Sequence, residues 1–201
     1  MIAAEDRGGA RVLVLDRADK ANALTRAMLA ELDAQVARAA AEGVAVLVIT
    51  GKGKVFSAGA DLEGMAQGLG QAPEWEVLSG RIAGFAGLTI AALNGTLAGG
   101  AFGMALACDC RVAVPGAEFF YPVMKRGYLP QPSDPKRLSA LVGPSRAKQI
   151  ILAGRRIGAE EARDWGLVDL IAEDAVEGAL ALAADALGAE PVHVRRMKAM
   201  F

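Results

Sequence analysis

One stretch of the chain restricts the fold more than any other: a helix-periodic segment that leads directly into a continuous apolar run. Apolar residues recur at helical spacing from Thr25 to Glu42, with Thr25 as the expected N-cap. After Gly43, the run from Val44 to Ile49 carries no polar residue. A strand that is apolar on both faces is typical of a parallel sheet covered by helices on both sides.

Short apolar strands and helices alternate along the rest of the chain. We expect further strands at Val12–Leu15, Thr89–Leu93, Arg111–Val114, Glu118–Phe120 and Val168–Ile171. We expect further helices at Glu74–Phe85, Gly99–Ala107, Lys136–Val142, Ser145–Ala153, Ala159–Trp165 and Ala175–Leu187. The stretch Gly64–Pro73, rich in Gly and Gln, is predicted to be a mobile loop. Strands separated by helices predict a single α/β domain with a buried sheet and a helical tail.

The composition excludes several classes of protein. A chain of 201 residues can bury a full hydrophobic core. Its 22 basic and 23 acidic residues balance, so the basic excess typical of a nucleic-acid-binding protein is missing. No apolar run reaches the roughly 18 residues of a membrane span, and the first residues lack the charged and apolar regions of a signal peptide. We therefore expect a cytoplasmic protein with neither nucleic acid nor membrane as a partner.

Few side chains are available for metal binding or nucleophilic catalysis. His193 is the only histidine and lies near the C-terminus, which excludes a multi-histidine metal site and argues against a Ser-His-Asp triad. The two cysteines, Cys108 and Cys110, cannot form a four-cysteine zinc site, and we interpret both as small apolar residues of the core. We expect no metal ion.

Two stretches combine a strand, a tight glycine turn and a helix start. These are Phe56–Leu62, which ends on Asp61-Leu62, and Asn94–Ala101, in which Gly99 and Gly100 open a helix. Helix N-termini leave backbone N–H groups free, and such groups bind anions or oxyanions. Two such starts facing each other would hold one oxygen between two N–H donors. The alternative is that the glycines only make tight turns and that Asp61 only caps a helix.

At this spacing the two stretches resemble those of the crotonase family, the enoyl-CoA hydratase/isomerase superfamily. Other matching segments follow in the same order: Arg17–Leu24, Val48–Gly51, Ile90–Gly95, Cys108-Asp109, Gly143-Pro144 and Ala159–Val168. The resemblance implies a spiral of ββα repeats over residues 1–170 that binds an acyl-CoA, and a truncated helical tail over residues 171–201. It also implies assembly as trimers or hexamers, and coenzyme A as part of the substrate rather than a permanently bound cofactor.

The resemblance also assigns roles to individual residues. In the family, the thioester oxygen lies between two backbone N–H groups, which map onto Ala60 and Gly100. The adenine is held by backbone around the turn that contains Ala58, Asp61 and Leu62.

The 3′-phosphate of the coenzyme lies near basic groups in the family. Lys20 is the best candidate here, with Arg17 and Lys54 as weaker ones, and an ordinary solvated lysine is the alternative for Lys20. Family members usually continue beyond this length with additional C-terminal helices. Either the cover they give is missing here, or a neighbouring subunit supplies it, or the assembly differs.

The sequence departs from the family at the acid–base residues. Hydratases of the family use two glutamates, and their positions here hold Gly103 and Val123. Each general acid or base contributes ~10²–10⁴-fold, so ordinary enoyl-CoA hydration is not expected. A further acid found in some members falls on Gln131. Asp134 is the nearest acid downstream and is a candidate acid or base. Ser133-Asp134-Pro135 also fits a helix start with Asp134 as N-cap.

Other side chains near the empty positions leave two hypotheses open. Glu63, Glu74 and Glu76 could turn inward, and Tyr121 or Tyr128 could donate a proton. The first hypothesis is an enzyme that stabilises the enolate of an acyl-CoA thioester in a backbone oxyanion hole. The second is a non-catalytic acyl-CoA-binding or assembly subunit of the same fold. If only the carboxylates are missing, Gly103→Glu with Val123→Glu is expected to create crotonyl-CoA hydration.

Overall fold

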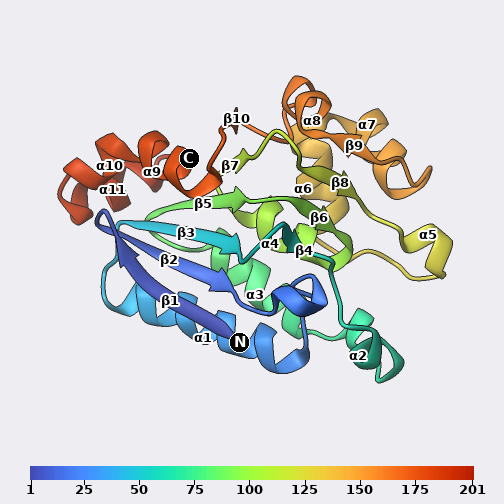
Figure 1. Cartoon of the computed structure of the whole chain (residues 1–201). Helices are drawn as coiled ribbons and strands as arrows, with labels where there is room; N and C mark the ends of the chain where they lie inside the picture. Colours follow the sequence, from blue (N-terminus) through green and yellow to red (C-terminus); the bar gives the residue numbers. More distant parts are fainter.

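The computed structural model describes all 201 residues and contains two β-sheets. The larger sheet has six strands in the order β1-β2-β3-β5-β7-β10 (Figure 1). Their bounds are Ile2–Arg7, Ala10–Leu15, Val46–Gly51, Leu88–Leu93, Cys110–Ala113 and Leu170–Ile171. Only β1 and β2 pair antiparallel, and the other neighbours are parallel. The buried parallel sheet predicted from the apolar runs is confirmed.

A smaller sheet has the order β4-β6-β8-β9, with bounds Val55–Ser57, Thr96–Ala98, Glu118–Phe120 and Ile157–Gly158. The successive pairs β3–β4, β5–β6 and β7–β8 each place one strand in each sheet, and the strands of successive pairs are parallel neighbours. The chain therefore advances by one strand in both sheets at every turn. This is the predicted crotonase-like spiral of ββα repeats.

Helices cover both faces of the larger sheet. On one face lie α1 (Arg26–Ala41), α3 (Glu74–Ala83) and α4 (Phe102–Ala107), and on the other lies α9 (Ala175–Leu182). Side chains of β3 alternate between the two layers, because successive residues of a strand point to opposite faces. Leu47 and Ile49 belong to the main core, whereas Val46 and Val48 pack with the alanines of α9.

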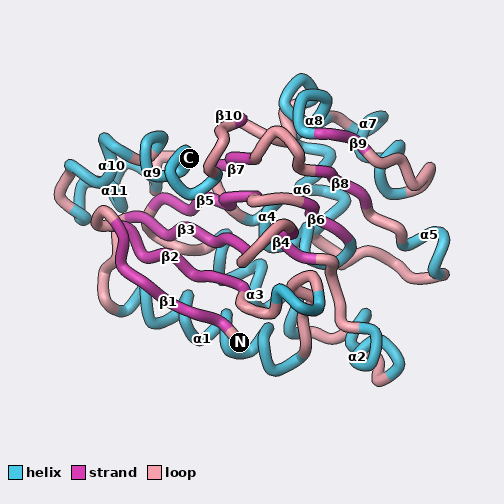
Figure 2. The backbone as a smooth tube through the Cα atoms, viewed as in Figure 1, coloured by secondary structure: helices cyan, strands magenta, loops and turns pink.

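The remaining helices are short and mostly lie at the edges of the molecule (Figure 2). They are α2 (Leu62–Ala66), α5 (Val123–Arg126), α6 (Asp134–Val142), α7 (Pro144–Ile151), α8 (Ala159–Trp165), α10 (Ala184–Gly188) and α11 (Pro191–Lys198). Three turns of 3₁₀-helix occur at Ala18–Lys20, Leu69–Gln71 and Gly99–Ala101. The segment assigned to the helical tail contains α9, α10 and α11.

The long elements agree with the sequence-based predictions. The Thr25 hydroxyl caps α1 by accepting a hydrogen bond from the Met28 N–H at 3.2 Å, and Gly43 follows the helix with φ +73°. The predicted mobile loop Gly64–Pro73 is wrong, because α2 and a 3₁₀ turn occupy most of it and Leu69 is buried.

The strands that the sequence did not predict lack an apolar signal. In the edge strand β1 only Ile2 is buried, so its sequence shows no alternation of apolar and polar residues. Strand β6 has three residues and β9 has two, which is too short for a period to show. Strand β4 is equally short, but it lies where the sequence predicts a strand before the first glycine turn.

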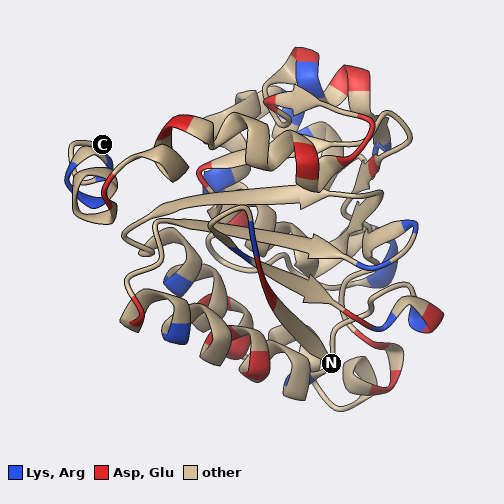
Figure 3. Ribbon diagram, turned by 60° about the vertical axis from the view of Figure 1, so that its left-hand side comes forward, with Lys and Arg blue, Asp and Glu red and all other residues tan.

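Acidic and basic residues are interspersed over the helices and loops (Figure 3). No helix combines the length and the apolar composition that a membrane span requires.

Candidate active site

A buried asparagine organises the turn between β2 and α1. Asn22 has a left-handed backbone with φ +51° and is fully buried. Its amide group donates to the carbonyl oxygens of Lys52 and Val55 at 3.0 and 2.7 Å, and its oxygen accepts from the Arg17 N–H at 2.9 Å. These bonds fix the segment after β2 against the loop before β4. Leu24 consequently forms a parallel bridge with Ala60.

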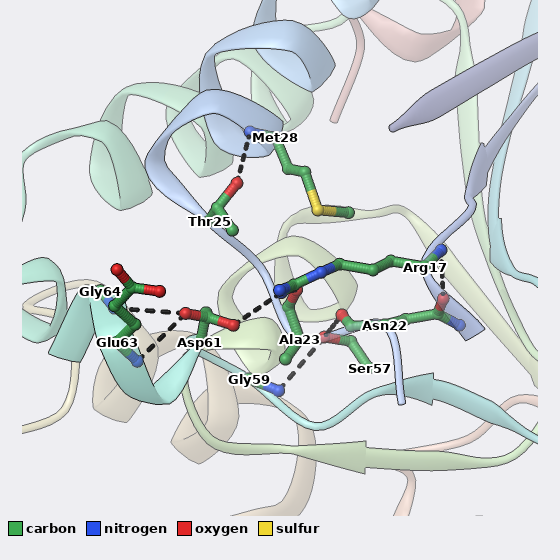
Figure 4. Close-up of polar contacts among 10 residues, drawn as sticks. All are labelled: Arg17, Asn22, Ala23, Thr25, Met28, Ser57, Gly59, Asp61, Glu63 and Gly64. Atoms are coloured by element: carbon green, nitrogen blue, oxygen red, sulfur yellow. Dashed lines mark hydrogen bonds and ion pairs between the residues drawn. The ribbon is translucent and has the colours of Figure 1, made fainter. Parts of the chain in front are cut away.

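Asp61 joins this turn to the start of α2 (Figure 4). One carboxylate oxygen accepts from the N–H groups of Glu63 and Gly64, and the other accepts from the Arg17 guanidinium at 2.7 Å. Arg17 and these N–H donors lower the pKa of Asp61 below its ordinary value. The interpretation of Asp61 as a helix cap is confirmed, and Arg17 is committed to this ion pair.

The Ala60 N–H has no hydrogen-bond partner in the chain, and the Gly100 N–H has none within its own turn. The bridge to Leu24 uses the carbonyl of Gly59 and the N–H of Asp61, so the Ala60 N–H is left free. Gly100 is the second residue of a three-residue 3₁₀ turn. At this position the turn itself offers no carbonyl oxygen to accept a hydrogen bond from the N–H. No backbone hydrogen bond outside the helices and strands uses either group as donor.

Glycine lets the two donor loops touch. Gly59 has φ +90°, and a Cβ built on it would lie 2.9 Å from the Ala98 oxygen and 3.4 Å from the Gly100 nitrogen. Gly99 has φ +57° and would bring a Cβ to 3.7 Å from the Gly59 Cα. Side chains are disfavoured at both φ values, and one at Gly59 would also push the loops apart.

Both donors line a cavity of about 320 Å³. Its walls are mainly apolar and come from loops after β4, β6 and β8 together with α3 and α5. The lining includes Ala58, Trp75, Phe120, Tyr121, Val123 and Gln131. The Trp75 ring lies against Gly100, since a Cβ built there would be 3.3 Å from it.

Asp134 fills the space beside Gly103, the first of the two positions at which family hydratases carry a glutamate. Gly103 is buried in α4, and a Cβ built on it would lie 3.0 Å from Asp134 Oδ1. Asp134 belongs to α6 and is fully buried. The second position, Val123, lines the cavity at the start of α5 and brings no charge.

Asp134 is not the cap of α6. Ser133 is the N-cap residue, Asp134 is the first residue of the helix, and no side chain caps it. The Asp134 carboxylate instead turns inward and accepts a hydrogen bond from the Tyr121 hydroxyl at 2.8 Å, while its Oδ1 has no partner. The capping interpretation is therefore wrong, because the carboxylate lies beside Gly103.

Burial shifts the pKa of both partners in this pair. Burial raises the pKa of Asp134 to about 7, with a further contribution from Glu76, although the bonds from Tyr121 and the charge of Arg137 oppose the shift. Burial and the adjacent carboxylate raise the pKa of Tyr121 above its ordinary value, so the phenol stays protonated. Tyr121 lines the cavity and Asp134 lies behind it.

The three glutamates considered from the sequence do not line the cavity. Glu74 pairs with Arg26, and Glu76 accepts hydrogen bonds from the N–H and hydroxyl of Ser133. Glu63 is exposed. These side chains serve structural or solvated roles.

The residues expected to hold the coenzyme lie at the edge of the site. Ala58 lines the cavity, and its N–H donates to the Ala21 oxygen at 3.0 Å. Leu62 and Lys20 are exposed outside the lining, as is Lys54. No three or more His, Cys, Asp and Glu side chains gather where they could hold a metal ion. Cys108 is buried, which raises the pKa of its thiol to about 12.

Several lining residues were not found from the sequence, and two of them bear on the site. Trp75 is the apolar cover of Gly100, and its indole N–H donates to the Leu69 oxygen at 2.8 Å. Arg126 ends α5 and is the one charged residue of the lining. An aromatic residue in an amphipathic helix and a basic residue at the end of a four-residue helix carry no pattern that marks a site.

Two sheets wound in ββα turns, with a cavity where the turns meet, define the crotonase class of α/β folds. The sequence model described as enoyl-CoA hydratase/isomerase matches residues 5–201. This chain belongs to the enoyl-CoA hydratase/isomerase family.

Individual relatives are similar in sequence and structure. Carnitinyl-CoA dehydratase of Escherichia coli K12 is 37% identical over 168 residues, which cover 78% of this chain and 62% of the relative. The chain thus spans less than two thirds of the length of that curated relative. The structure of Pseudomonas aeruginosa DspI has a TM-score of 0.90 at 32% identity and covers 98% of this chain and 84% of DspI. The enoyl-CoA hydratase of Bacillus anthracis has a TM-score of 0.90 at 31% identity, over 96% of this chain and 79% of the hydratase.

Proposed function

We propose that the protein binds an acyl-CoA and holds the thioester oxygen between the N–H groups of Ala60 and Gly100. The observation that carries this proposal is the pair of backbone donors at the starts of two touching loops that line one cavity. An enolate of a thioester bears negative charge on this oxygen, and fixed donors stabilise that charge more strongly than they stabilise the neutral carbonyl. Loss of one such donor costs roughly 3–4 kcal/mol of transition-state stabilisation in comparable sites.

Asp134 is the proposed acid or base, acting through Tyr121. The Tyr121 hydroxyl donates to Asp134, so an ionised Asp134 would take this proton while the Tyr121 oxygen removes one from the substrate carbon, and the reverse movement would deliver a proton. The short contact between the two groups and a carboxyl pKa near neutrality support this role. Ordinary enoyl-CoA hydration is not proposed, because Gly103 and Val123 supply no carboxylate.

A non-catalytic acyl-CoA-binding or assembly subunit is the second candidate. It is favoured by one observation, the absence of any carboxylate from the cavity lining itself. Tyr121 with Asp134 behind it favours the enzyme instead. Assembly as trimers or hexamers and a cytoplasmic location remain predictions.

Calorimetric titration with CoA, acetyl-CoA, crotonyl-CoA and malonyl-CoA, followed by a turnover assay of each, tests both candidates. An enzyme is expected to bind and convert at least one thioester, with turnover lost in Asp134→Asn. Binding without turnover of any thioester would support the non-catalytic binding subunit and exclude the enzyme. No binding at millimolar ligand would overturn both.

A further inference from the structure

Arg126 supplies the one formal charge among the residues that line the largely apolar cavity, and the residue itself is exposed to solvent. Of the 19 lining residues, 12 are hydrophobic, and no carboxylate accompanies the guanidinium. Arg126 is also absent from the ion pairs of the chain. The cavity thus presents a cation that nothing in the protein neutralises.

Arg156, a second arginine at this end of the molecule, shows the contrast. Its guanidinium pairs with Glu118 at 2.7 Å and stacks over Phe120, 4.0 Å from the ring centroid. Phe120 lines the cavity, so Arg156 supports the wall from outside. Arg126 has neither an acidic partner nor an aromatic ring of this kind, and its donors remain available to a ligand.

We propose that Arg126 binds a carboxylate at the far end of the acyl group, so that the substrate class is a monothioester of a dicarboxylic acid. This inference rests on the proposed binding of an acyl-CoA. The planar guanidinium of arginine matches a carboxylate with two parallel hydrogen bonds. The other lining residues carry no charge, so Arg126 is the one group of the cavity that can pair with an anion.

The phosphates of the coenzyme are a second source of negative charge. The segment expected to hold the nucleotide, Ala58 to Leu62, follows β4, whereas Arg126 lies at the end of α5 on a different wall. We therefore assign the carboxylate to the acyl group, and the experiment separates the two sources.

Calorimetry compares malonyl-, succinyl- and glutaryl-CoA with the neutral butyryl- and valeryl-CoA and with free CoA. The wild-type protein is expected to bind at least one carboxylated thioester about tenfold more tightly than the neutral ones. Arg126→Gln is expected to abolish that preference while changing the affinity for neutral thioesters and free CoA by less than about twofold. Lys125→Gln removes the same charge from the adjacent position, which is exposed like Arg126 but lies outside the lining, and is expected to keep the preference.

Each other outcome overturns the inference. Equal binding of neutral and carboxylated thioesters by the wild-type protein would show that the cavity does not recognise a carboxylate. A uniform loss for all ligands in Arg126→Gln, free CoA included, would place a coenzyme phosphate at Arg126. Failure of every CoA compound to bind the wild-type protein would refute the proposed function itself.

Discussion

The Asp134 carboxylate lies where a side chain at position 103 would begin, with Oδ1 3.0 Å from a Cβ built on Gly103. The two positions belong to different helices, α4 and α6, that pack against each other. A carboxyl group is therefore present beside the empty glutamate position, although it comes from another part of the chain. Glycine at position 103 leaves the room that this carboxylate needs.

Restoring the family glutamates should therefore require a third change. Gly103→Glu places its side chain against Asp134, and overpacking of a core typically costs about 1–3 kcal/mol. We expect Gly103→Glu with Val123→Glu to be destabilised and inactive in crotonyl-CoA hydration. Adding Asp134→Gly should restore stability and permit hydration, which an ultraviolet assay of crotonyl-CoA measures. Hydration by the double variant with Asp134 intact would contradict this relationship and agree with the expectation from sequence alone.

Asp134 should make stability depend on pH in a defined direction. Because its pKa is raised from 3.8 to about 7, the folded protein keeps a proton that the unfolded chain releases in that interval. The free energy of unfolding should fall with rising pH across it, by about 1.4 kcal/mol per pH unit relative to Asp134→Asn, and level off above it. Tyr121, Glu76 and Arg137 surround the carboxylate and are unchanged in the variant.

Urea unfolding of the wild-type protein and of Asp134→Asn across this pH range measures the difference. Groups that titrate alike in both proteins cancel. A difference that stays constant with pH would show that Asp134 is ionised throughout.

Tyr121→Phe should be more harmful at high pH than at low pH. The variant removes the hydrogen bond to Asp134, which leaves a buried carboxylate without its donor once it ionises. We expect a loss of about 1–3 kcal/mol in the free energy of unfolding above the Asp134 pKa and a smaller loss below it. Tyr128→Phe is the control, since Tyr128 lines the same cavity but is exposed. Equal losses for Tyr121→Phe at both pH values would argue against coupling of the pair.

Gly59→Ala tests the contact between the donor loops. Its methyl group would meet the Ala98 oxygen at 2.9 Å and separate Ala60 from Gly100. Turnover of a bound thioester should fall by about 10²-fold, as it does when an oxyanion donor is lost. Gly154→Ala is the matched control. Gly154 also has a positive φ, +67°, but it has open space around it and lies outside the cavity. If both variants lose activity equally, general backbone strain and not loop separation is responsible.

The sequence was sufficient for the elements whose pattern is long and periodic. The α1 helix with its Thr25 cap and the doubly buried β3 strand could be predicted because capping and burial leave local signals. The β1 strand could not, since only Ile2 of it is buried, although it pairs with its neighbour β2 across Gly8-Gly9. The three-residue strand β6 could not either, since pairing with β4 and β8 determines it.

The site divides in the same way. The two donor loops could be anticipated because glycine turns and strand ends mark them locally, whereas the positions Ala60 and Gly100 within them follow from the resemblance to the family and stay a prediction. The inward turn of Asp134 could not, because its partner Tyr121 and the empty volume at Gly103 come from other elements. From the sequence, a helix cap was the simpler interpretation of Ser133-Asp134-Pro135.

The most direct test of the account observes the two donors themselves. Amide ¹H–¹⁵N NMR spectra of protein labelled at alanine and glycine would be recorded with butyryl-CoA and with S-butyl-CoA, a thioether that lacks the carbonyl oxygen. We predict downfield shifts of the Ala60 and Gly100 amide protons with the thioester and not with the thioether. Unchanged amide protons at both residues in the thioester complex, or equal shifts with the two ligands, would contradict an oxyanion hole at this position.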